Sequence, residues 1–69
     1  MNNEIKTTGI VFSVDYIIYT GKIIKIGFRH GKSYGNVEII VPEPEKNPFF
    51  NSILSGEIVS IKITKLPIN

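Results

Sequence analysis

Hydrophobic and polar residues alternate along most of this chain with the period of two that is typical of β-strands. The alternation predicts four clear strands and one further short extended segment that we count as a strand of its own. These segments are residues 5–14, 16–19, 22–29, 34–41 and 57–66. Turn-forming residues such as glycine and proline separate most of them, so the pattern predicts a β-dominated fold.

The first strand contains a break in its hydrophobic phase. Three apolar side chains share one face and are expected to point into the core: Ile10, Phe12 and Val14. A two-residue turn at Thr20-Gly21 would instead bring Asp15 onto that face. We therefore predict a β-bulge near Asp15 and Tyr16, which bends a long first strand.

Residues 22–41 form the clearest unit, a hairpin around the turn signal at Gly31-Lys32. A two-residue turn there gives one register that suits both faces of the hairpin, and a slip of one residue would not. Apolar residues meet on the core face, and attractive polar pairs form on the other face. The pairs are Ile26 with Val37, Lys25 with Glu38, and Arg29 with Tyr34.

The stretch after residue 41 is predicted to be a loop that leads into a short helix. Pro42 and Pro44 exclude a central strand, because proline lacks the N–H donor. Asn47-Pro48 is a helix-start signal, and Ser55-Gly56 closes one or two helical turns. So short a helix is held only by packing, so we expect apolar side chains to plug the barrel: Phe49 or Phe50, with Ile53 and Leu54.

Composition supports a single small all-β domain over residues 1–69. Fourteen Ile and five Val favour strands, and the absence of Ala removes the best helix former. With no Cys and one His, we expect no disulfide, no metal site and no cofactor. The chain has no apolar run of about 18 residues and no signal peptide, so we expect a soluble, cytoplasmic protein.

The entry into the last strand reads Leu-x-Gly-Glu-x-Val-x-Ile-x-Ile from Leu54 to Ile63. This stretch, with the order of elements before it, resembles the OB-fold family, in particular bacterial translation initiation factor one and ribosomal RNA-binding repeats. The resemblance implies a small five-stranded barrel with one helix before the last strand, if residues 16–19 count as a strand; if they do not, the barrel is incomplete. Five strands with a helical turn before the last also fit an SH3-like barrel, which is the alternative fold.

The excess positive charge lies in the hairpin, where residues 22–32 carry four Lys or Arg and no acid. Cations for phosphates beside an aromatic ring for a base are what single-stranded DNA or RNA binding needs. The face of the second and third strands is also the binding surface that the OB-fold resemblance implies. The candidate binding residues are Lys22, Lys25, Arg29, His30, Lys32, Tyr34 and Asn36.

A second hypothesis is a protein interface. Ile18, Ile23 and Ile40 are expected to align across three strands on the face away from the core, as an apolar patch. Such a patch suits a homodimer, an assembly subunit, or a phage or mobile-element inhibitor of a host complex. No nucleophile elbow and no glycine-rich phosphate loop is present, so we do not expect an enzyme.

Overall fold

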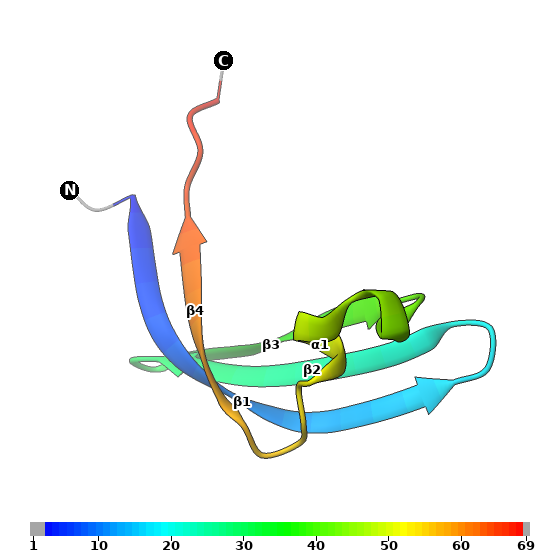
Figure 1. Ribbon diagram of the computed structural model, residues 1–69. Coiled ribbons are helices and arrows are strands. Elements are labelled where there is room, and N and C mark those ends of the chain that lie inside the picture. Colours follow the sequence, from blue (N-terminus) through cyan, green and yellow to red (C-terminus); the bar gives the residue numbers. More distant parts are fainter. Residues whose placement is uncertain (1–2, 69) are drawn as a thin grey trace.

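The computed structural model describes residues 3–68 and contains one antiparallel sheet. Its order is β3-β2-β1-β4, and a 3₁₀ turn η1 and a short helix α1 lie over one face (Figure 1). The elements are β1 (Glu4–Ile17), β2 (Gly21–His30), β3 (Ser33–Val41), η1 (Pro44–Lys46), α1 (Pro48–Asn51) and β4 (Ile58–Thr64). Among the described residues, no helix is long and apolar enough to cross a membrane.

The sheet is open, so the prediction of a closed five-stranded barrel is wrong, whereas the β-dominated class is confirmed. Over residues 3–68 the sheet has four strands, and β3 and β4 are its two edges. The predicted separate strand at residues 16–19 does not exist, because β1 continues to Ile17 and residues 18–20 form a turn. Residues 3–68 therefore provide no fifth strand that could join the two edges and close the sheet.

The predicted register of the β2–β3 hairpin is confirmed along its whole length. Gly31 and Lys32 form the turn, with Gly31 at a positive φ of 63°. The pairs of the two strands include Ile26 with Val37, Lys25 with Glu38, and Arg29 with Tyr34. A two-residue turn and two differently patterned faces thus specify one pairing.

The bulge of β1 lies at Phe12, not near Asp15 and Tyr16 as predicted. Val11 pairs with Ile26 and Ser13 pairs with Lys25, so Phe12 is the extra residue between them. The bulge changes which side chains face inward: Val11 is fully buried, and Phe12 is 54% exposed. The predicted inward set of Ile10, Phe12 and Val14 is therefore correct only for Val14, which packs against the core.

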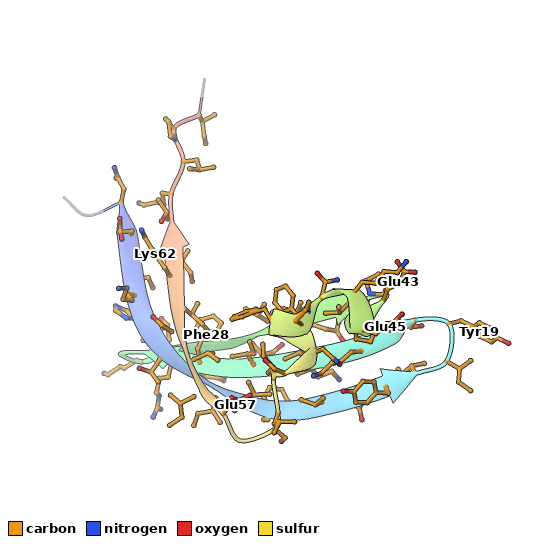
Figure 2. All side chains as sticks on the ribbon, viewed as in Figure 1. Tyr19, Phe28, Glu43, Glu45, Glu57 and Lys62 are labelled. Atoms are coloured by element: carbon orange, nitrogen blue, oxygen red, sulfur yellow. The ribbon has the colours of Figure 1, made fainter. Side chains whose placement is uncertain are left out.

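The β1–β2 turn spans three residues instead of the expected two at Thr20-Gly21. The Thr20 N–H donates to the Ile17 carbonyl over 3.1 Å, and Tyr19 has a positive φ of 72°. Tyr19 projects from this turn into solvent (Figure 2). As a consequence Ile17 pairs with Gly21, and Ile18 is part of the turn.

The core lies between the sheet and α1. Its buried apolar side chains come from β1, β2 and β3 and from the segment after the helix: Val11, Ile24, Ile26, Val41 and Ile53. Of the predicted plug residues, Ile53 is buried and Phe50 packs against the core. Phe49 and Leu54 are exposed, because the open sheet leaves no closed interior for them.

The two strand segments farthest from the helix leave the sheet as an arm, which we define as residues 4–8 of β1 and residues 60–64 of β4. Pairing between β1 and β4 continues to Glu4 and Thr64, whereas pairing between β1 and β2 begins at Gly9 and Phe28. Figure 1 shows the arm rising from β2 and β3, and Figure 2 places Phe28 near its base. Each strand of the arm is therefore paired only with the other.

Candidate nucleic-acid interface

The face of the sheet opposite α1, which we call the outer face, carries the predicted Arg29–Tyr34 pair. These two residues lie directly opposite each other near the end of the β2–β3 hairpin. Both side chains are exposed, Tyr34 to 83%. The Thr7 hydroxyl donates to the Arg29 carbonyl over 2.5 Å and so links β1 to this end of β2. The pair thus presents a ring and a guanidinium from rigid strands.

An open groove of about 390 Å³ lies beside this pair on the outer face. Phe12 and Ile10 form its apolar part, and both are about half exposed. The Phe12 ring lies over Gly27, where a Cβ would lie 3.4 Å from the Phe12 Cδ1 atom, an ordinary van der Waals contact. The lining residues are Thr8, Ile10, Phe12, Gly27, Phe28 and Arg29.

Phe12 and Ile10 are site residues that sequence reasoning missed, because the pattern placed both in the core. The bulge at Phe12 reverses that expectation. One signal for the outward position of Phe12 was present in the sequence: Gly27 occupies an outward position in the middle of a strand. A strand glycine often marks the close approach of another group.

The remaining hairpin candidates surround the groove unevenly. Asn36 lies opposite Gly27, and Lys25 lies opposite Glu38, whose carboxylate offsets part of its charge. His30 and Lys32 are exposed at the turn, next to Arg29 along the chain. The positive charge of the outer face is thus concentrated at the hairpin tip, around Arg29, and is weaker toward Lys25.

Lys22 does not belong to this surface, which corrects its assignment as a phosphate-binding residue. It is fully buried on the inner face, under α1. Its ammonium donates to the carbonyls of Phe50, Asn51 and Ile53 over 3.0, 2.8 and 2.7 Å. The Tyr16 ring covers it, with the Nζ atom 5.5 Å from the ring centroid. All three of its hydrogen bonds therefore go to the helix and the segment directly after it, and no donor remains for a phosphate.

The predicted row of three isoleucines is not formed. Ile23 and Ile40 are opposite each other on the outer face, as expected. The third position in that row is occupied by Asp15, because the longer β1–β2 turn shifts the register of β1. Ile18 lies in the turn and is 78% exposed. A carboxylate beside two isoleucines makes a smaller and less apolar patch than the sequence predicted.

Among residues 3–68 no three His, Cys, Asp or Glu side chains are grouped as a metal site requires. Comparisons with protein-family models, with curated proteins and with solved structures found no match to this chain. The arrangement of side chains on the outer face is therefore the basis on which its function is inferred.

Proposed function

We propose that the outer face binds single-stranded nucleic acid, DNA or RNA, with little preference for sequence. The observation that carries this proposal is the groove beside Phe12, with Arg29 on its wall and Tyr34 directly across from Arg29. One short stretch of sheet thus combines two exposed aromatic rings with a cation. These are the groups that stack bases and neutralise phosphates.

Weak sequence preference follows from the kinds of side chain present. Stacking on an aromatic ring is available to every base, and a guanidinium near the backbone attracts any phosphate. Few groups on this face are suited to read the edge of a base. Asn36, which lies opposite Gly27, supplies an amide side chain of the kind that does so. Binding is then dominated by stacking and charge, and should fall steeply as salt rises.

The resemblance of residues 54–63 to OB-fold proteins favours the same face for a separate reason, although the sheet of this chain is open and has four strands. In OB-folds, oligonucleotides bind the face of the second and third strands and the loops beside it. Arg29 and Tyr34 belong to β2 and β3 of this chain. The open sheet also leaves the outer face unobstructed, because η1 and α1 lie on the inner side (Figure 1).

Replacing Tyr34 with alanine tests the stacking role. We expect Tyr34→Ala to weaken binding of a fluorescent single-stranded oligonucleotide about tenfold at low salt, because stacking on one ring contributes about 1–3 kcal/mol per base. The matched control is Tyr19→Ala, which removes another exposed ring from the β1–β2 turn at the other end of β2. If both variants bind like the wild type, or if both lose affinity equally, the assigned face is wrong.

Replacing Arg29 with glutamine tests the charge. Arg29→Gln should weaken binding and lower the slope of log affinity against log salt by about 0.7, the value for one phosphate contact on a single strand. Lys46→Gln is the control, because Lys46 lies in η1 and is ion-paired with Glu43 at 3.3 Å. Affinity that does not depend on salt, or no binding to any oligonucleotide at low salt, would refute the proposal as a whole.

A further inference from the structure

The chain exposes more surface than a self-contained domain of its size. A folded monomer of 7.7 kDa is expected to expose about 4,300 Å², and this chain exposes 5686 Å². Its radius of gyration is 14.0 Å, against about 11 Å for a compact domain of this length. Part of the difference comes from the tail, where Leu66 and Ile68 are exposed, and the open sheet and its arm account for the rest. The excess of about 1,400 Å² exceeds the roughly 800 Å² that each partner contributes to a standard interface.

The inner side of the open sheet supplies an apolar surface for such an interface. A groove of about 270 Å³ runs between β4, the β2–β3 hairpin and the helix, and Ser60 is its one polar lining residue. Ile39 and Val37 approach it from β3, and Ile61 and Val59 from β4. In a closed barrel another strand would cover these side chains. Here the gap between the two sheet edges leaves Val37 exposed and the other three side chains only partly buried.

The free edge of β4 has backbone groups available for pairing with another strand. The Lys65 N–H donates to the Asn3 carbonyl and the Val11 N–H to the Glu57 carbonyl, which sets the alternation along the β1–β4 ladder. Odd-numbered residues of β4 therefore bond to β1, and the N–H groups of Ser60 and Lys62 point away from it. Between Ile58 and Thr64 the strand has no proline, and its one charged residue, Lys62, is ion-paired with Glu4 of the neighbouring strand at 3.4 Å, so its charge does little to block pairing at this edge.

We propose that the chain forms a homodimer in which β4 of one copy pairs antiparallel with β4 of the other. With Ile61 at the two-fold axis, Val59 of each copy lies opposite Ile63 of its partner on the inner face. Ser60 lies opposite Lys62 on the outer face, so no like charges meet. A pairing of identical strands about a two-fold axis is an isologous contact, which closes the assembly at two copies.

The arm explains why β4, and not β3, is the edge we assign to the dimer. β3 pairs with β2, which is itself paired with β1, whereas residues 60–64 pair with a segment of β1 that has no other partner strand. A two-stranded ribbon is marginally stable in water. Pairing with a second copy turns two such arms into a four-stranded unit, and the added strand continues the inner face toward the groove. The proposal is independent of nucleic-acid binding, since it rests on the edge and inner face of the sheet.

Solution mass and amide exchange test the proposal with the unmodified chain. Light scattering from micromolar to millimolar concentration should show a rise to twice the 7.7 kDa chain mass. In the dimer, the amide protons of Ser60 and Lys62 should exchange slowly with solvent. Those of Asn36 and Glu38 on the free edge of β3 should stay fast, because the two-residue turn directs even-numbered β3 amides away from β2. A monomer at every concentration, or protection at β3 instead, would overturn the proposal.

Two proline variants distinguish the β4 edge from the β3 edge. Lys62→Pro removes an edge N–H without removing a β1–β4 hydrogen bond, so it should weaken dimerisation at least about tenfold, since the symmetric contact loses two bonds. Glu38→Pro makes the matched change on β3 and should leave the dimer intact. Circular dichroism confirms that each variant is folded. A folded Lys62→Pro variant with unchanged dimer affinity would contradict the assigned edge.

Discussion

Replacing Lys22 with methionine should lower the free energy of unfolding by about 3 kcal/mol, because three carbonyls, one in a buried and two in part-buried hydrogen bonds, lose their charged donor at once. The methionine chain retains most of the apolar contacts of the lysine stem but leaves the carbonyls of Phe50, Asn51 and Ile53 without the ammonium. The variant no longer has to bury the lysine charge, and this gain offsets part of the loss. The expected loss of stability is therefore smaller than the sum of three hydrogen bonds. For a domain this small, whose total stability is about 3–10 kcal/mol, the melting temperature should fall by about 15 °C.

Lys46→Met is the control for this experiment. It removes the same kind of charge from an exposed ion pair with Glu43, in which both side chains are more than 60% exposed. An exposed pair contributes about 0–1 kcal/mol, so the melting temperature should change little. Thermal unfolding followed by circular dichroism measures both variants. Equal effects in the two variants would show that Lys22 does not hold the helix to the sheet.

Replacing Gly21 with alanine is the second change with a large expected effect. Gly21 begins β2 with a φ of 101°, in the left-handed region that side chains rarely adopt. A Cβ there would lie 2.7 Å from the Pro42 carbonyl oxygen and closer still to that of Val41. Both atoms belong to the backbone and can move only if the end of β3 moves. We expect a loss of about 3 kcal/mol, more than the 1–2 kcal/mol of a left-handed residue alone.

Gly31→Ala separates the energetic cost of a steric clash from the cost of the left-handed backbone conformation. Gly31 also has a positive φ, 63°, but a Cβ at that position meets no atom within 4 Å. This variant should therefore lose only about 1 kcal/mol, the cost of the left-handed conformation for alanine. Urea unfolding of both variants gives the comparison. If the two losses are the same, the close approach of Val41 and Pro42 to Gly21 is not an energetic constraint.

The hairpin of β2 and β3 could be predicted from the sequence because two independent patterns agreed on it. The turn at Gly31 sets the spacing, and the apolar and polar faces reject the neighbouring registers. Arg29 and Tyr34, the centre of the proposed binding face, followed directly from that register. Local periodicity with a short turn leaves little freedom, which is why this part of the candidate site was accessible without a structure.

Sequence predictions fail where one residue changes the hydrophobic phase of a strand, or where a contact joins residues that are distant in the sequence. A bulge adds a single position, and around Phe12 either phase puts an apolar side chain inward, so the pattern does not locate it. The three-residue β1–β2 turn then moved Ile18 away from Ile23. Lys22 shares its side of β2 with Ile24 and Ile26, which was a visible sign of its inward direction. Its carbonyl partners lie 28 to 31 residues away, and no local pattern reports them.

The contact between Lys22 and the helix also has a consequence for the order in which the chain folds. A helix of four residues does not form alone, because nucleation costs more than its few hydrogen bonds return. Its carbonyls gain their donor only after β2 has been placed, so the β2–β3 hairpin leads and the segment from 42 to 57 follows. Contacts made after the transition state mainly set how fast a protein unfolds. Lys22 then affects the unfolding rate of the chain more than its folding rate.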